Sequence, residues 1–228
     1  MTDTPTGLLP AIELETGNRP THTILWMHGL GADGNDFVPI VDELALPRSL
    51  RVRFIFPHAP MRPVSINGGL VMRAWHDYDL AGSNPTFREN MASLHDSQRA
   101  IETLIHREKQ RGIVPQNIIL AGFSQGGSLA LQTGLRYAEK LAGIMALSCY
   151  LPAPQTLAAE AHQANSAISI FMAHGSLDNI IPMTLAAASR HQLRESGYAV
   201  TWREYPMAHS VCNDEIADIG EWLQQVLI

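Results

Sequence analysis

The sequence predicts an α/β fold in which helices cover both faces of a mostly parallel central sheet. Short apolar runs of strand length alternate with longer stretches that carry apolar residues at helical spacing. The 228 residues are 46% hydrophobic and 17% charged, which is typical of a globular chain with a sizeable core. No repeat, low-complexity tract or linker divides the sequence, so we expect residues 1–228 to form a single domain.

The first quarter of the chain begins with strand-like segments. Residues 11–15 are expected to form a short edge strand, and residues 23–27 read as a buried strand. Residues 36–46 carry apolar side chains at helical spacing, which indicates a helix. A further strand is expected over residues 52–56, and Pro57 ends it.

Residues 57–90 have little periodicity and are rich in Pro, Gly and Asn. A stretch of this length without regular structure is typical of a lid or a binding loop. We therefore expect a lid-like insertion at about 57–90 within the single domain.

The rest of the chain alternates regularly. A long amphipathic helix is expected over residues 91–111, and Gly112 caps its end. The later strands are expected at 117–121, 142–148, 168–173 and 199–205, and the later helices at 125–138, 155–164, 183–196 and 213–227. Strands separated by helices in this way pair in parallel.

The segment Gly122-Phe123-Ser124-Gln125-Gly126 lies between a predicted strand and a predicted helix. G-x-S-x-G in that setting is the signature of a nucleophile elbow, in which the serine hydroxyl points out of a sharp turn above the sheet. The alternative interpretation is a glycine-rich turn with an incidental serine. The flanking strand and helix favour the elbow, and with it the α/β-hydrolase fold.

A serine nucleophile needs a base, and the base needs an orienting carboxylate. In α/β-hydrolases these residues follow the serine in the order acid, then histidine, each just beyond a strand. Asp178 follows the strand over 168–173, and His209 follows the strand over 199–205. We therefore predict a triad of Ser124, His209 and Asp178.

Three other candidates fit this order less well. His174 precedes the acid, His191 falls within a predicted helix, and Asp214 lies where a carboxylate favours a helix N-terminus. Structural roles suffice for these side chains.

Acyl transfer also needs backbone N–H groups that stabilise the oxyanion. The first is expected from Gln125, directly after the serine, and the second from the glycine-rich loop after the early buried strand, at Leu30. His28, just before that loop, is expected to be a hydrogen-bonded structural residue.

The same loop reads as G-x-G-x-x-G over residues 29–34, which is also the fingerprint of dinucleotide binding. That fingerprint requires an acidic residue at the end of the next strand, and here Pro57 and His58 follow it. The dinucleotide interpretation also leaves the serine constellation without a role. We expect no cofactor, and no histidine or cysteine spacing indicates a metal site.

Six motifs in order carry a resemblance to a known family. They are residues 28–34, Ala74-Trp75-His76-Asp77, residues 122–127, residues 147–152, His174-Gly175 with Asp178, and residues 207–210. From about residue 20 to its end, the chain resembles the carboxylesterase and acyl-protein thioesterase family. The resemblance implies an α/β-hydrolase that cleaves carboxylic esters or thioesters with Ser124 as nucleophile, His209 as base and Asp178 as orienter.

Family resemblance also implies a shallow apolar groove for the acyl chain. Its candidate residues are Met72 and Trp75 in the insertion, with Tyr150 and Ile181 as further candidates. Arg73 and His76 depart from the family's pattern and would alter the polarity of the groove. Acyl-protein thioesterase or lysophospholipase activity at the same site, a non-catalytic acyl-binding module and a homodimer remain open alternatives.

Composition limits the partners and the compartment. The formal net charge of −6 disfavours nucleic acids and anionic membranes, because no basic surplus neutralises phosphates. Two cysteines fit no disulfide framework, and residues 1–5 lack the pattern of a signal peptide. We expect a cytoplasmic enzyme without stable membrane insertion, acting on a small ester or an acylated protein.

Overall fold

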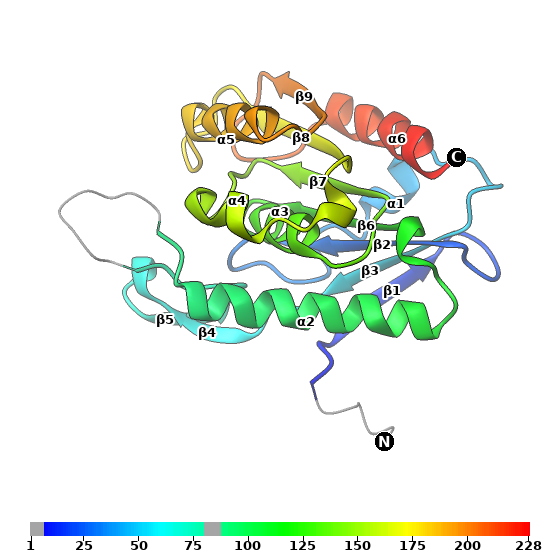
Figure 1. Ribbon diagram of the computed structural model, residues 1–228, viewed down its shortest axis with the longest axis horizontal. Helices are drawn as coiled ribbons and strands as arrows, with labels where there is room; N and C mark the ends of the chain where they lie inside the picture. The colour runs from blue at the N-terminus through cyan, green and yellow to red at the C-terminus, as the bar shows by residue number, and fades with distance from the viewer. Residues whose placement is uncertain (1–6, 80–87) are drawn as a thin grey trace.

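The computed structural model describes residues 7–79 and 88–228. In this part of the chain, seven strands form one sheet in the order β1-β3-β2-β6-β7-β8-β9. Only β1 is antiparallel, against β3, so the predicted mostly parallel sheet is confirmed (Figure 1). The strands are β1 (Ala11–Glu15), β2 (His22–Met27), β3 (Val52–Pro57), β6 (Ile118–Phe123), β7 (Gly143–Leu147), β8 (Ser169–Gly175) and β9 (Val200–Tyr205).

Helices cover both faces of this sheet, and two cores result. One core packs the sheet against α2 (Met91–Gln110), α3 (Gln125–Arg136), α4 (Leu157–Glu160) and α5 (Met183–Glu195). The other packs it against α1 (Ile40–Glu43) and α6 (Asn213–Leu227). Successive residues of β2 enter opposite cores, because side chains alternate across a strand: Leu25 enters the first and Trp26 the second.

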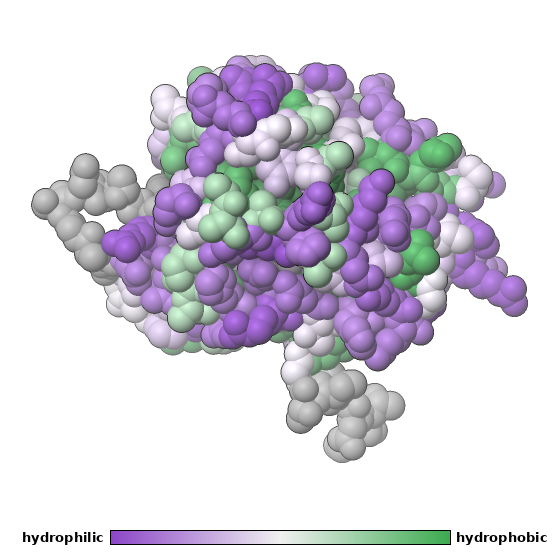
Figure 2. Space-filling view, in the orientation of Figure 1, coloured by the Kyte–Doolittle hydropathy of each residue, from purple (hydrophilic) through white to green (hydrophobic). Residues whose placement is uncertain are grey.

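The outer surfaces of α2 and α5 are largely hydrophilic, as Figure 2 shows for the face to which they belong. This is the expected pattern for helices whose apolar stripe is buried against a sheet. Among the described residues, no helix combines the length and the apolarity that crossing a membrane requires.

The predicted helix over residues 36–46 is much shorter in the structure. Only Ile40–Glu43 is α-helical, because three-residue turns from Asp33 to Asp36 and from Asn35 to Val38 come before it. The chain leaves the helix at Ala45, whose φ is +49°. The predicted helix over 155–164 likewise reduces to α4 between two short 3-10 turns.

The segment expected to lack regular structure contains a hairpin. Strands β4 (Met61–Val64) and β5 (Leu70–Arg73) pair in antiparallel register, joined by a 3-10 turn at Ser65–Asn67 and two glycines with positive φ. Residues 80–87 of the predicted insertion lie outside the described residues, as does the N-terminal stretch in which no signal peptide was predicted.

The hairpin lies beside the amino end of α2, on the side toward which the parallel strands point (left in Figure 1). Beyond it, Tyr78 forms a bridge with Glu89, and the Asp79 N–H donates to the Arg88 carbonyl at 2.7 Å. The Asn90 side chain then caps α2 by accepting from the Ser93 N–H at 3.1 Å. The insertion therefore begins and ends at the carboxyl edge of the sheet.

Candidate active site

Ser124 occupies a sharp turn between β6 and α3, with φ +54° and ψ −121°. The turn forms because glycines flank it. A Cβ at Gly122 would come within 2.3 Å of the Gly126 backbone, and a Cβ at Gly126 would come within 2.3 Å of the Met27 carbonyl. Any larger residue at either position would push the helix away from the sheet, so the sequence G-x-S-x-G is a steric requirement of this turn.

The structure brings Ser124, His209 and Asp178 together. The His209 Nε2 lies 2.9 Å from the Ser124 Oγ, and the His209 Nδ1 lies 2.6 Å from the Asp178 Oδ2. His209 follows β9 and Asp178 follows β8, so each side chain extends from the carboxyl end of a parallel strand. A neutral His209 that donates from Nδ1 to Asp178 can accept the Ser124 proton at Nε2.

Asp178 is held in place by the loop that carries it. Its Oδ1 accepts hydrogen bonds from the Ile180 N–H at 2.8 Å and the Ile181 N–H at 2.9 Å. The buried His174 Nε2 lies 2.8 Å from the Ile181 carbonyl and 3.4 Å from the Asp178 Oδ2. Because His174 lies behind the acid, it supports the loop and does not reach the serine.

The other two competitors lie elsewhere. His191 pairs with Glu195 at 3.2 Å on the exposed face of α5, and Asp214 lies in the first turn of α6. Both positions agree with the structural roles expected for these residues.

A cleft of about 250 Å³ opens at Ser124. The catalytic candidates Ser124 and His209 lie on its surface together with Leu30 and Ile181, two of the predicted site residues. The remaining lining residues are Gly29, Ala32, Asp36, Ile66, Tyr78, Phe123 and Ile180. The Phe123 ring, whose centroid is 4.7 Å from that of His209, packs against the base.

Two residues predicted for the acyl groove lie beneath it instead. Trp75 is fully buried in the core, and its indole N–H donates to the His28 carbonyl at 2.9 Å. Tyr150 is also buried, and burial raises the pKa of its phenol. The Met72 sulfur accepts a hydrogen bond from Asn67 at 3.3 Å, and it would lie 3.7 Å from a Cβ at Gly31, just outside the cleft lining.

The two family departures do not alter the polarity of the cleft. His76 is completely buried, and burial lowers its pKa to about 3, so its ring is neutral. Arg73 donates to the Ala59 carbonyl at 2.9 Å.

The loop after β2 is held by His28. Its Nδ1 donates to the Gly29 carbonyl at 2.7 Å, and its Nε2 accepts from the Ala59 N–H at 3.1 Å. Burial lowers the pKa of His28 to about 4, which keeps the ring neutral and preserves this pattern. Leu30 follows, and within the described chain no hydrogen bond engages its N–H. Gln125 is the first residue of α3, so its N–H has no partner inside the helix.

Sequence reasoning missed the role of the Gln125 side chain and most of the cleft lining. Ile66 lies in the hairpin and Tyr78 just beyond it, where no periodic pattern was visible. Phe123 and Gln125 occupy the variable positions of G-x-S-x-G, and only their place beside Ser124 could have indicated a contact.

The glycine-rich loop departs from the geometry of a dinucleotide site. In that fingerprint the helix begins within the motif, whereas α1 begins only at Ile40, after several turns. Among the described residues, no group of three histidine, cysteine or carboxylate side chains could hold a metal ion. Cys149 is buried, and burial raises the pKa of its thiol.

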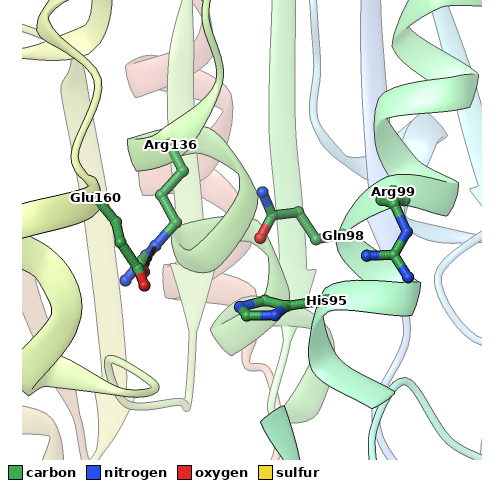
Figure 3. A pocket seen from close by; sticks show the side chains of 5 residues that line it. All are labelled: His95, Gln98, Arg99, Arg136 and Glu160. Carbon is green, nitrogen blue, oxygen red and sulfur yellow. Dashed lines mark hydrogen bonds and ion pairs between the residues drawn. The ribbon is translucent and has the colours of Figure 1, made fainter. Parts of the chain in front are cut away.

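A second hollow, of about 340 Å³, lies between α2, α3 and α4 (Figure 3). Arg136 points into it, but Glu160 pairs with its guanidinium at 2.7 Å and Thr156 accepts from the same group at 2.8 Å. The cation is thus already neutralised and hydrogen-bonded, and the triad lies elsewhere.

A serine, histidine and carboxylate joined by hydrogen bonds at the carboxyl edge of a mostly parallel sheet define the class of α/β-hydrolases. Comparison with known proteins agrees. The phospholipase/carboxylesterase family matches residues 10–227. Acyl-protein thioesterase 1 of Neurospora crassa is 37% identical over 230 residues, which span 98% of this chain and 92% of the relative. Its counterpart in Gibberella zeae is 33% identical over 228 residues, 97% of each chain.

Solved structures give the same result. Acyl-protein thioesterase 2 of Zea mays superposes with a TM-score of 0.82 at 25% identity, over 96% of this chain and 99% of that one. SOBER1 of Arabidopsis thaliana gives a TM-score of 0.82 at 28% identity, over 91% and 99%. The chain therefore belongs to the phospholipase/carboxylesterase family and is a carboxylic ester hydrolase with the α/β-hydrolase fold.

Proposed function

We propose that this hydrolase cleaves carboxylic esters and thioesters of short- to medium-chain acyl groups through an acyl-enzyme on Ser124. One observation carries the proposal. An unbroken chain of hydrogen bonds runs from the Ser124 Oγ through His209 to Asp178, and the serine end opens on a cleft.

In the first step, the Ser124 Oγ attacks the acyl carbonyl while the His209 Nε2 takes its proton. The Asp178 carboxylate stabilises the imidazolium that forms, since it accepts from Nδ1 at 2.6 Å. The N–H groups of Gln125 and Leu30 stabilise the oxyanion of the tetrahedral intermediate. The intermediate collapses when His209 protonates the leaving alcohol or thiol, which leaves the acyl group on Ser124.

In the second step, water attacks the acyl-enzyme. His209 accepts the water proton and returns it to the Ser124 Oγ, so the carboxylic acid leaves and the serine is restored. His209 packs against Phe123 while its Nδ1 is tied to Asp178, so the ring keeps one orientation for both proton transfers.

The size of the cleft supports a short- to medium-chain acyl group. At about 250 Å³ it is smaller than the roughly 300–1,000 Å³ typical of small-molecule sites. Leu30, Ile66, Ile180 and Ile181 are among its lining residues, and their aliphatic side chains suit an alkyl chain.

Acyl-protein thioesterase or lysophospholipase activity at the same site is the second candidate. It is supported by the relatives named acyl-protein thioesterase, at 33–37% identity over nearly the whole chain. A protein-bound acyl group and a lysophospholipid both present an acyl carbonyl to the same serine, so either reaction uses the mechanism above.

The position of Asp36 supports a preference of the enzyme among leaving groups of different charge. Asp36 lines the cleft and precedes Phe37, whose ring centroid lies 5.6 Å from that of Phe123, and Phe123 in turn packs on His209. Because His209 protonates the leaving group, we propose that this group departs past Asp36. Its carboxylate disfavours anionic leaving groups and favours neutral or cationic ones.

A matched substrate panel tests these proposals. The rates for p-nitrophenyl esters of increasing acyl length should peak at short to medium chains. Butyryl-thiocholine and butyryl-coenzyme A share an acyl group and a thioester bond but differ in leaving-group charge. The enzyme should prefer the cationic thiocholine, and Asp36→Asn should reduce that preference. Asp42→Asn, which removes the same charge outside the cleft lining, is the control. An enzyme that turns over no member of the panel would refute the proposal, and an unchanged preference in Asp36→Asn would refute the role of Asp36.

A further inference from the structure

The side chain of Gln125 makes an unusual set of contacts for a residue beside a nucleophile. Its Oε1 accepts from the Trp75 backbone N–H at 2.7 Å, and its Nε2 donates to the His76 carbonyl at 2.8 Å. The same Nε2 also donates to the Tyr78 hydroxyl at 3.3 Å. Gln125 is 3% exposed, so these bonds form away from water, where losing one is costly.

The partners fix which way the amide points. The Trp75 N–H faces the Gln125 Oε1, and the His76 carbonyl faces the Gln125 Nε2. Rotating the Gln125 amide by 180° would therefore break both short bonds. Burial raises the pKa of Tyr78 to about 12, so its phenol stays protonated at the cleft wall. Only an uncharged donor and acceptor pair fits this position.

Trp75 also binds the loop after β2, which contains Leu30. While its backbone N–H binds Gln125, its indole N–H donates to the His28 carbonyl at 2.9 Å. His28 comes two residues before Leu30. One residue of the insertion thus connects the two backbone segments that are proposed to supply the oxyanion donors.

We infer that the Gln125 side chain is a positioning residue, which together with Trp75 sets the separation of the two oxyanion donors. This inference rests on the proposed acyl-enzyme mechanism. The Gln125 N–H has no partner within α3, while the carbonyl of the same peptide unit, that of Ser124, accepts from the Ser128 N–H at 3.0 Å. The hydrogen bonds of the Gln125 side-chain amide fix the position of the same residue from the side of the insertion.

The test compares Gln125→Met and Gln125→Glu with the wild-type enzyme. Methionine keeps the length and the backbone N–H but loses all three hydrogen bonds. We expect kcat to fall by about tenfold to a hundredfold, less than the 10²–10³ lost with a whole oxyanion donor, while KM changes little. A boronic acid inhibitor, which places an oxygen in the oxyanion hole, should weaken in proportion, and binding of the product carboxylic acid should not.

Glutamate adds a readout that a purely structural role would not give. When the glutamate carboxyl is protonated, it can accept from the Trp75 N–H and donate to the His76 carbonyl. When it is ionised, its negative oxygen faces the His76 carbonyl oxygen and repels it. The ratio of Gln125→Glu to wild-type activity should therefore rise as the pH falls from 8.5 to 5.5. Over this range neither His76, with a pKa of about 3, nor Tyr78, with a pKa of about 12, changes charge. The other ionisable side chains of this region, Asp77, Glu89, Tyr150 and His209, are present in both enzymes, which is why activity is expressed as a ratio to the wild type.

Ser97→Ala is the matched control. Its hydroxyl donates to the Trp75 carbonyl, so the variant loosens the same segment from α2 without touching Gln125. We expect it to keep kcat within about threefold, and the melting temperatures of both variants are measured beside their rates. Trp75→Phe removes the indole N–H and part of the buried ring but keeps the backbone N–H that binds Gln125, and it should lower kcat less than Gln125→Met does.

The inference is overturned if Gln125→Met retains kcat within twofold, if Ser97→Ala loses as much, or if the Gln125→Glu ratio is flat with pH. Failure of the proposed function looks different. In that case the wild-type enzyme itself forms no covalent adduct on Ser124 with a fluorophosphonate probe.

Discussion

The two sides of the cleft are built in contrasting ways. On one side, Ser124, Asp178 and His209 follow the ends of three parallel strands, and hydrogen bonds hold each of them. On the other, the β4–β5 hairpin presents large apolar side chains to solvent, with Ile66 39% exposed and Leu70 63% exposed. On the catalytic side the sheet fixes where each side chain lies, whereas the hairpin side supplies apolar surface to the cleft wall. The contrast predicts that the reaction and the choice of acyl group are separable in this enzyme.

The strongest test of the catalytic side is Ser124→Ala. It removes the proposed nucleophile and leaves the other cleft-lining residues unchanged, so we expect kcat for p-nitrophenyl butyrate to fall by about 10⁶-fold. Labelling by a fluorophosphonate probe should disappear while the melting temperature is retained. Activity that survived this change would move the nucleophile to another residue.

Asp178→Asn is expected to lower kcat by about 10⁴-fold, because an amide N–H opposite the His209 Nδ1 favours the wrong tautomer. KM should change little, since Asp178 does not line the cleft. Steady-state kinetics across an acyl series measures both values. A rate within tenfold of the wild type would show that another group orients His209.

The hairpin side is tested by Ile66→Asp. A carboxylate in the apolar wall should raise KM for butyryl and longer esters by about tenfold and leave acetyl ester hydrolysis nearly unchanged. The exposed Leu70→Asp, outside the cleft lining, is the matched control. A uniform loss of kcat for every chain length would mean that the hairpin supports the chemistry as well, and the contrast drawn above would fail.

Glu215, in the first turn of α6, gives the smallest expected effect. Burial, opposed by a hydrogen bond from the Cys212 backbone and reinforced by Asp218, raises its pKa to about 8. The Glu215 carboxyl ionises at a lower pH in the unfolded chain than in the folded one. Its contribution to the free energy of unfolding is therefore fully present below pH 4.5 and is lost as the pH rises towards 8. Glu215→Gln should therefore melt a few degrees higher than the wild type at pH 8 and equally at pH 4.5. Parallel melting curves at all pH values would contradict this.

The catalytic side was also the part that the sequence predicted best. Asp178 and His209 could be placed because parallel strands end at one edge of a sheet, so their order along the chain implies their proximity. The hairpin offered no such rule. Its strands are four residues each and largely exposed, so no apolar alternation marked them.

Trp75 shows a different limit. An aromatic residue in a presumed loop was expected to face the substrate, yet hydrogen bonds to His28 and Gln125 draw it into the core. Those bonds join residues about fifty positions apart, and a single sequence contains no signal for such a pairing.

The backbone of Ser124 has a consequence for heat resistance. A residue with a side chain at φ +54° and ψ −121° carries strain on the order of 1–3 kcal/mol. Glycine adopts that conformation freely, and the added freedom of its unfolded chain takes back only about 0.4–1 kcal/mol. An enzyme with glycine in this turn would be inert and yet outlast the active one on heating. Selection for thermal stability alone would therefore favour glycine at position 124, where the proposed mechanism requires serine.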